Sequence, residues 1–300
     1  MWQQLLSELQ QGVTRSLARC ISLVENEAGE YEQLMKSLQL VHPAKIIGVT
    51  GPPGAGKSTL VDAIIGELVN RKYKVGVLCV DPSSPFNLGA LLGDRIRMSD
   101  WYNHPDVFIR SLATRGALGG LHPKIIEITL LLKEANFDYI IVETVGVGQS
   151  EIEIAGLADT TLVVLVPEGG DEIQTMKAGI MEIADVFVVN KSDRPGADEF
   201  ARNLHLMLSP SVKKTHTEIP VIKTIASKKS GIPELVQAIQ KLETGLMGND
   251  KKYWLLTEQA YHLIQNKKMK TIDKQQLKDQ IEELDKKGSF NLYHFIEQLA

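Results

Sequence analysis

Residues 51–58 combine glycines, a lysine and a hydroxyl group in a spacing that binds phosphate. The segment Gly51-Pro-Pro-Gly-Ala-Gly-Lys-Ser58 fits the pattern G-x-x-x-x-G-K-[ST] and is followed by Thr59. Glycines let the backbone approach phosphate oxygens and direct N–H groups at them. Lys57 is expected to reach the β- and γ-phosphates, and Ser58 to ligate Mg²⁺. We therefore expect nucleotide contacts from Gly51, Pro52, Pro53, Gly54, Ala55, Gly56, Lys57, Ser58 and Thr59.

The segments on either side of this pattern predict a strand, a loop and a helix. Residues 45–50 are mostly apolar and indicate a buried strand, whereas residues 59–69 place Leu60, Ile64 and Leu68 at helical spacing. The positive end of that helix adds to the attraction for phosphate. A strand–loop–helix context is what the motif requires, so we expect the chain to bind a nucleoside triphosphate.

Strands and helices alternate from residue 44 to about residue 244, which predicts an α/β fold with a mostly parallel central sheet, that of a P-loop NTPase. Ligands of such sheets lie beyond the carboxyl ends of the strands, so residues at those ends are candidates for the site. The strands that we expect are 45–50, 74–80, 106–110, 138–143, 160–166, 185–190 and 221–225.

Two acidic residues follow apolar strands at this edge. Asp81 comes after residues 75–80 and precedes Pro82, so it is expected either to serve Mg²⁺ and water or to cap a turn. Glu143 ends an apolar strand and leads into the glycine-containing segment 144–150. That arrangement is typical of a Mg²⁺-side carboxylate followed by a loop that senses the γ-phosphate, here through the Gly146 amide.

The segment Asn190-Lys-Ser-Asp193 at the end of another apolar strand predicts recognition of guanine. A carboxylate accepts hydrogen bonds from guanine N1–H and the 2-amino group, whereas adenine offers neither donor. Lys191 is expected to lie along the base and Asn190 to tie this loop to the phosphate-binding loop. We expect backbone groups of Ala226, Ser227 and Lys228 to close the base pocket.

Two further loops contain glycines and charges. The segment 110–120 holds Arg110 and Arg115, which are expected to meet phosphate, to meet a partner's carboxylate, or simply to be solvated. The segment 167–177 is interpreted either as a movable loop or as an ordinary strand-to-helix connection with Asp171 as its N-cap.

The composition excludes several classes of protein. The 300 residues are 43% apolar and carry a formal net charge of −4, which disfavours nucleic acid as the main partner. Two cysteines without metal-binding spacing exclude a disulfide framework. We recognise no signal peptide and no apolar run long enough for a membrane, so we expect a cytoplasmic protein with no membrane partner.

Helical patterns are expected at both ends of the chain. Residues 1–43 predict a helical extension with helices at 2–11, 15–26 and about 30–38, Gly12 as a break and Thr14 as a cap. Residues 246–300 contain apolar helical stripes outside the predicted sheet, which must be buried on the domain or on a second copy. We therefore divide the chain into 1–43, a nucleotide domain at 44–245, and 246–300.

Taken together, six segments resemble the methylmalonyl-CoA mutase-associated GTPases, the MeaB/ArgK family of the signal-recognition-particle-like and MinD-like class. The resemblance spans roughly residues 13–245. The segments that carry it are 17–26, 50–59, Asp81-Pro-Ser-Ser84, Leu92-Gly-Asp-Arg-Ile-Arg-Met98, Glu143-Thr-Val-Gly-Val-Gly-Gln-Ser-Glu151 and 179–185.

The resemblance implies GTP hydrolysis, coupled to loading and protecting an adenosylcobalamin-dependent acyl-CoA mutase. It makes residues 167–177 the loop that addresses the mutase and residues 246–300 a dimerisation arm, hence a homodimer. Two departures from the family are the Ile225-Ala-Ser-Lys228 segment, which replaces its usual Ser-Ala pair, and the arm, which matches only in pattern. The implied catalytic residues are Lys57, Asp81, Asp94 and Glu143, and the implied Mg²⁺ ligands are Ser58, Asp81, Asp94 and Glu143.

Three other functions stay open at this point. A transport-associated kinase would need a phosphoacceptor site, which we do not find in the sequence. A nickel-insertion GTPase usually carries clusters of Cys and His, whereas Cys20 and Cys79 are isolated here. A module that binds GTP without hydrolysing it would be distinguished by single-turnover hydrolysis.

Overall fold

The computed structural model describes residues 2–40, 43–81, 98–114, 121–145, 150–168, 183–215, 219–243, 248–269 and 272–297. The chain forms two compact units, Met1–Leu255 and Leu256–Ala300, whose boundary lies inside helix α12 (Gly248–Met269). The division at residues 43/44 and 245/246 stays a prediction.

The first unit contains a seven-stranded sheet in the order β3-β2-β4-β1-β5-β6-β7, in which every pairing is parallel. This confirms the expected α/β fold of a P-loop NTPase. Strands β1, β2, β4, β5 and β6 are buried almost throughout, which explains their nearly continuous apolar sequences. The strands are β1 (Lys45–Thr50), β2 (Val75–Asp81), β3 (Val107–Ala113), β4 (Tyr139–Glu143), β5 (Thr160–Leu165), β6 (Val186–Val189) and β7 (Val221–Lys223).

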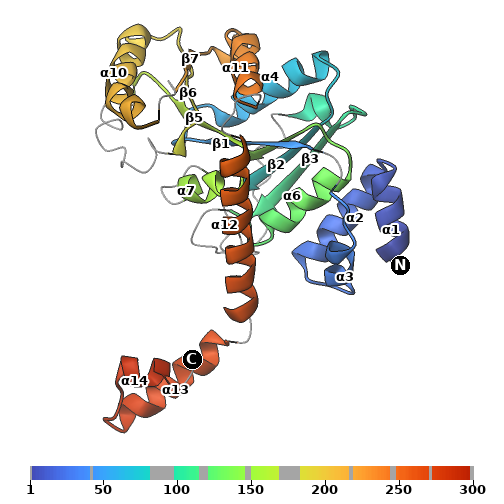
Figure 1. The fold of residues 1–300 in the computed structure, drawn as a ribbon, viewed down its shortest axis with the longest axis vertical. Helices are drawn as coiled ribbons and strands as arrows, with labels where there is room; N and C mark the ends of the chain where they lie inside the picture. The colour runs from blue at the N-terminus through green and yellow to red at the C-terminus, as the bar shows by residue number, and fades with distance from the viewer. Residues whose placement is uncertain are drawn as a thin grey trace. The chain divides into compact units, whose positions relative to one another are not determined.

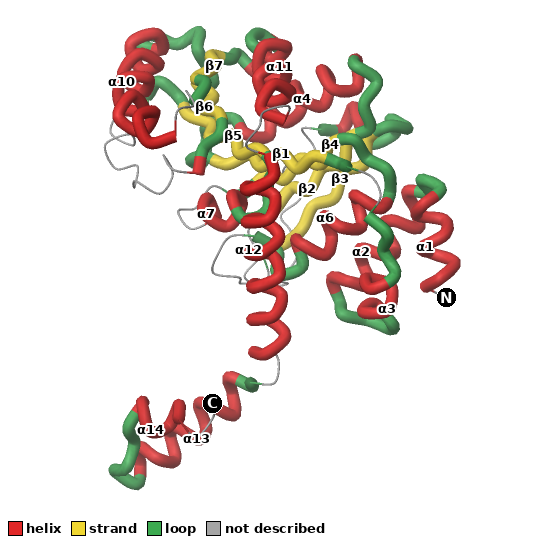
Figure 2. Tube along the Cα trace, viewed as in Figure 1, coloured by secondary structure: helices red, strands yellow, loops and turns green. Residues whose placement is uncertain are grey.

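Helices cover both faces of the sheet (Figures 1 and 2). Helices α4 (Lys57–Asn70) and α11 (Ile232–Glu243) share one apolar core with strand residues such as Ile47 and Val77. On the opposite face, α10 (Ala197–Thr215) packs on Val163 and Phe187. That face is also covered by α6 (Ile125–Glu134) and α7 (Ser150–Ala155), while the short turns η1 (Ser99–Trp101) and η2 (Ala226–Lys228) connect elements.

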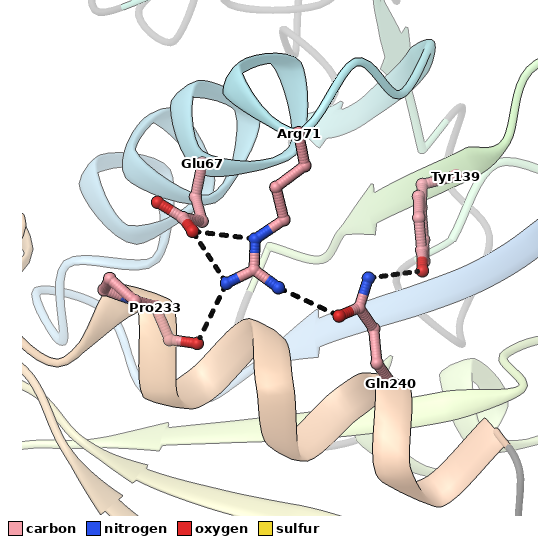
Figure 3. A network of polar contacts seen from close by, with 5 residues as sticks. All are labelled: Glu67, Arg71, Tyr139, Pro233 and Gln240. Carbon is pink, nitrogen blue, oxygen red and sulfur yellow. Dashed lines mark hydrogen bonds and ion pairs between the residues drawn. The ribbon is translucent and has the colours of Figure 1, made fainter.

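A polar network fixes α4 relative to α11 (Figure 3). Arg71 at the end of α4 donates to Glu67 at 2.8 Å and to Gln240 of α11 at 2.9 Å. The same guanidinium reaches the Pro233 carbonyl at 3.4 Å, and Gln240 donates to the Tyr139 hydroxyl of β4 at 3.4 Å. The network therefore holds together the helix that follows the phosphate-binding loop and the helix that follows η2.

The N-terminal extension forms α1 (Trp2–Gln10), α2 (Thr14–Glu25) and α3 (Tyr31–Lys36). Gly12 has a φ of +83°, which agrees with the expected break after the first helix. The expected cap at Thr14 is wrong, because Thr14 is already the first helical residue. Val13 is the N-cap and has no side-chain capping bond; its carbonyl instead accepts from the amides of Ser16 and Leu17.

Charged contacts attach this extension to the sheet domain. The buried Glu134 carboxylate of α6 accepts from Gln10 Nε2 at 2.6 Å and from the backbone amides of Gln39 and Leu40. Lys124 pairs with Glu27 at 2.9 Å. Losing the bonds to Glu134 would leave a buried carboxylate short of partners, so they fix where the extension sits.

The second unit consists of the remainder of α12 together with α13 (Lys274–Lys286) and α14 (Leu292–Glu297). Asp273 caps α13 by accepting from the Gln275 amide at 2.7 Å. Several large apolar side chains are exposed here: Leu256, Tyr261, Ile264, Met269, Ile272, Leu292, Tyr293 and Ile296. Among the described residues, none of the helices has the length and apolarity needed to cross a membrane.

The close approach of α7 to β1 requires glycine at position 48. A Cβ atom at Gly48 would lie 2.5 Å from Ile154 Cγ1 and 3.0 Å from the Ala158 Cβ. We expect Gly48→Ala to lower the free energy of unfolding by about 1–3 kcal/mol, the usual cost of overpacking. Urea unfolding of both proteins measures this.

Gly156→Ala is the matched control, since a Cβ there meets only ordinary contact, 3.5 Å from the Glu153 carbonyl. We expect its unfolding free energy to stay within about 0.5 kcal/mol of the parent. Equal effects of the two substitutions would contradict the packing argument.

Candidate nucleotide site

The loop between β1 and α4 has a backbone that only glycine can supply at two positions. Gly51 has a φ of +141°, and a Cβ there would lie 2.2 Å from the Val164 carbonyl oxygen of β5. Gly56, the N-cap of α4, has a φ of +87°, and a Cβ there would lie 2.5 Å from Asn190 Nδ2. The loop therefore packs closely against the β5 backbone and the Asn190 side chain, and it leads into the N-terminus of α4. Such an N-terminus attracts anions.

Lys57 and Ser58 form the first turn of α4, and both are buried. The Lys57 ammonium donates to the Gly51 carbonyl at 2.9 Å and to the Pro52 carbonyl at 3.2 Å. These two bonds hold the lysine across the loop that precedes it. A charge in that position can stabilise phosphate oxygens bound over the loop.

The expected Mg²⁺-side residues meet at one edge of the sheet. Ser58 Oγ donates to Glu143 Oε1 at 2.7 Å, which joins the start of α4 to the end of β4. Asp81 ends the adjacent strand β2, where Cys79 is in register with Glu143. Asp81 and Glu143 are 6% and 3% exposed, so both carboxylates lie inside the protein. Asp94 and Gly146 lie outside the described residues.

Asn190 connects the phosphate-binding loop to the expected base-binding loops. Its amide nitrogen donates to the Ala55 carbonyl at 2.9 Å. Its amide oxygen accepts from the Ala226 amide at 3.1 Å and from the Thr224 hydroxyl at 3.2 Å. The residue is 2% exposed, so all three contacts are shielded from water.

The rest of the Asn190–Asp193 segment lies beside η2. Lys191 has a φ of +54° and donates from Nζ to the Gly54 carbonyl at 2.7 Å. The Asp193 carboxylate pairs with Lys228 Nζ at 3.1 Å, and Ala226, Ser227 and Lys228 form the η2 turn. The hydrogen bond from Lys228 lowers the pKa of Asp193, so this exposed group is an ionised acceptor at neutral pH.

Several contacts in this region were not predicted from the sequence. The hydroxyls of Thr50 and Thr144 are hydrogen-bonded at 2.9 Å, a buried link between the carboxyl ends of β1 and β4. Arg194 pairs with Glu168, which connects the base loop to the start of segment 167–177. The only sequence signal was position, since Thr50 ends one apolar strand and Thr144 directly follows another.

Comparison with known proteins agrees with this geometry. The family described as methylmalonyl Co-A mutase-associated GTPase MeaB matches residues 17–281. The chain belongs to the MeaB family. Its sheet, its phosphate-binding loop and that family match make it a P-loop GTPase, which binds GTP and GDP.

Individual relatives extend the comparison. The GTPase ArgK of Escherichia coli is 36% identical over 264 residues, 85% of this chain and 80% of that protein. The methylmalonic aciduria type A homolog, mitochondrial, of Caenorhabditis elegans is 38% identical over 207 residues, covering 64% and 52%. The crystal structure of an LAO/AO transport system kinase superposes with a TM-score of 0.66 at 26% identity, covering 99% of this chain and 96% of the other.

The Asp193 carboxylate gives a test of base recognition. We expect wild-type protein to bind GTP much more tightly than ATP, because adenine lacks the two donors that a carboxylate accepts. Asp193→Asn should favour XTP over GTP, since xanthine carries an oxygen where guanine has its amino group. Competition against a fluorescent guanine nucleotide measures all three affinities.

Asp198→Asn is the matched control. Asp198 also pairs with a lysine, Lys223 at 2.5 Å, but it lies on α10 and not in the expected base-binding loops. It should leave the order of the three affinities unchanged. Equal affinity of the wild type for ATP and GTP would refute the assignment of Asp193.

Proposed function

We propose that this GTPase gates the loading of cofactor into an adenosylcobalamin-dependent acyl-CoA mutase and protects that enzyme. The observation that carries the proposal is the 2.7 Å bond between Ser58 and Glu143. It ties the nucleotide-binding helix directly to the strand that enters segment 144–151. A difference between GTP and GDP at Ser58 can therefore be passed to β4 and to the segment that follows it in the sequence. Membership of a family named for its association with the mutase supports the choice of partner.

The residues at this edge fit a magnesium ion. A serine hydroxyl and two buried carboxylates, those of Ser58, Asp81 and Glu143, supply the hard oxygen ligands that Mg²⁺ prefers. The family resemblance adds Asp94 as a fourth ligand. When bound, Mg²⁺ would neutralise charge on the β- and γ-phosphates.

The protein's own residues have distinct tasks in hydrolysis under this proposal. The N–H groups of the loop, which Pro52 and Pro53 lack, cradle the phosphates, and Lys57 lies over their oxygens. Asp193 fixes the base, and Asn190 holds base and phosphate sites at a constant separation. Three carboxylates bind Mg²⁺ and its water, those of Asp81, Asp94 and Glu143. The Gly146 amide senses the γ-phosphate.

Loss of the γ-phosphate would release the segments that it holds, which is a common GTPase switch. Segment 167–177 is the one that we assign to the mutase. Its first two residues are described, and the Glu168–Arg194 pair ties it to the base loop. Asp171, Glu172 and Lys177 lie outside the described residues.

The relay makes a specific prediction about catalysis. A purified adenosylcobalamin-dependent methylmalonyl-CoA mutase should accelerate GTP turnover by the wild-type protein. Changing Asp171, Glu172 and Lys177 to Ala should leave basal turnover nearly intact and remove the acceleration, since these residues contact the partner and not phosphate. Lys57→Ala should reduce turnover about 10²-fold or more with and without the mutase. Phosphate release measures each rate.

Changing Asp198, Glu199 and Lys223 to Ala is the matched control, because it removes the same types of charge from exposed positions on α10 and β7. It should preserve the acceleration. If the triple change in 167–177 instead abolishes basal turnover, that loop belongs to the active site and the relay is wrong.

We propose further that residues 246–300 form the arm of a homodimer. The exposed apolar side chains of the second unit support this, because Tyr261 and Ile264 are 65% and 55% exposed on the same helix, and Tyr293 is 79% exposed. Burying such side chains against a second copy removes apolar surface from water.

The dimer is tested by ending the chain after Gly245. The full-length protein should be a dimer by light scattering at micromolar concentration, and the shortened protein a monomer with unchanged GTP affinity. A full-length monomer under these conditions would refute the arm. A shortened protein that remains a dimer would place the interface elsewhere.

Two alternative functions have weaker support. One solved relative is a transport system kinase, but a kinase needs a phosphoacceptor site, and we find none in this sequence. A nickel-delivery role would call on cysteine thiolates, whereas Cys20 and Cys79 are buried and burial raises the pKa of Cys20 to about 11. Equilibrium dialysis with nickel tests the latter role directly.

A further inference from the structure

A pocket of about 680 Å³ lies between the N-terminal helices and edge strand β3, where the GTPase assignment gives it no role. Strands β2 and β4 separate β3 from β1, the strand that precedes the phosphate-binding loop. The pocket is lined by residues of α1, α2 and β3: Gln4, Leu5, Glu8, Arg15, Ala18, Arg19, Ser22, Leu23 and Arg110.

Three arginine side chains face this pocket with a single lining carboxylate. Arg15 and Arg19 are one turn apart on α2, an arrangement in which like charges repel. Within the described part of the chain, neither guanidinium makes a hydrogen bond or a salt bridge. The lining carboxylate, Glu8, already accepts from Gln4 and Ser16. The pocket therefore carries more positive charge than its own side chains neutralise.

Arg110 shows a second sign of an incomplete site. One of its terminal nitrogens pairs with Glu25 and with the Ser22 hydroxyl. Its Nε is buried and has no hydrogen-bond partner among the described residues. Buried N–H groups in proteins are nearly always satisfied, so the unpaired Nε leaves positive charge beside the pocket that the described residues only partly neutralise.

We propose that this pocket binds a small organic anion that carries a phosphate or carboxylate group on an apolar body. The planar guanidinium matches both acid groups, which can accept two parallel hydrogen bonds from it. Leu5, Ala18 and Leu23 supply an apolar wall for the body of the ligand. The volume lies in the range of small-molecule sites, roughly 300–1,000 Å³. The site is independent of the proposed mutase function.

The test is titration calorimetry on the full-length protein saturated with GDP and Mg²⁺, which keeps the phosphate-binding loop occupied. The probes are phenyl phosphate, benzoate and the neutral benzyl alcohol. Phenyl phosphate or benzoate should bind saturably with one site per chain, and the stronger of the two identifies the acid group. Benzyl alcohol should not bind, because it has no charge for the arginines.

Arg15→Gln combined with Arg19→Gln should weaken binding of the stronger probe by about tenfold or more, as expected for charge-assisted hydrogen bonds. Both positions are exposed, so the fold should persist. Arg202→Gln, an exposed change on α10, is the matched control and should leave binding within about twofold.

Three outcomes would overturn the proposal. They are no saturable binding of either acid up to about 10 mM, equal binding of benzyl alcohol, and unchanged affinity in the double variant. The first two use the wild-type protein, so they decide the question even if the double variant folds poorly.

Discussion

The nucleotide site depends on one side-chain amide, that of Asn190. It donates to the phosphate-binding loop through the Ala55 carbonyl and accepts from Thr224 and the Ala226 amide, where the base pocket is expected. A buried amide with three partners on two segments cannot move toward one segment without leaving a partner on the other unpaired, at about 1–3 kcal/mol for each lost partner. The separation between phosphate and base sites is therefore fixed before a nucleotide arrives. Gly56 is part of the same constraint, since any larger residue there would collide with the Asn190 amide.

The parallel sheet supplies the geometry that this amide locks. Strands β1, β2, β4 and β6 all end at one edge, so residues far apart in the sequence meet there without long loops. Close packing keeps the edge rigid: Gly51 touches β5, and the Thr50 and Thr144 hydroxyls join β1 to β4. Away from the phosphate-binding loop, the Arg71 side chain joins α4 to Gln240 of α11, and Gln240 in turn joins α11 to β4. Because the strands themselves are held, the proposed response to the γ-phosphate is assigned to the connecting segments.

Much of this architecture could be predicted from the sequence, for identifiable reasons. Buried parallel strands need unbroken apolar runs, so β1 was predicted at its exact bounds and the other strands to within a few residues. The phosphate-binding loop and Asn190 were predictable because their chemistry requires fixed residue types at fixed spacing. The Thr14 cap was wrong because helix starts depend on backbone details that a capping residue type does not determine. The Glu168–Arg194 and Asp193–Lys228 pairs, and the arginine pocket, depend on which distant segments meet, and no local pattern encodes that.

Two charged groups of the candidate site have partners within the protein itself, and this affects which base the site would select. Lys57 is held by two carbonyls of the loop, and Asp193 by Lys228. The binding free energy of a ligand therefore reflects only the difference between its own contacts with these groups and the internal contacts that it weakens. Guanine can meet that condition at Asp193, because its N1–H and 2-amino group together offer two donors to a carboxylate that has one lysine. Adenine presents a lone pair to the same carboxylate. It offers Asp193 no donor to replace a weakened contact with Lys228. We therefore expect internal pairing to raise the discrimination against adenine, through an exposed ion pair whose own contribution to stability is small.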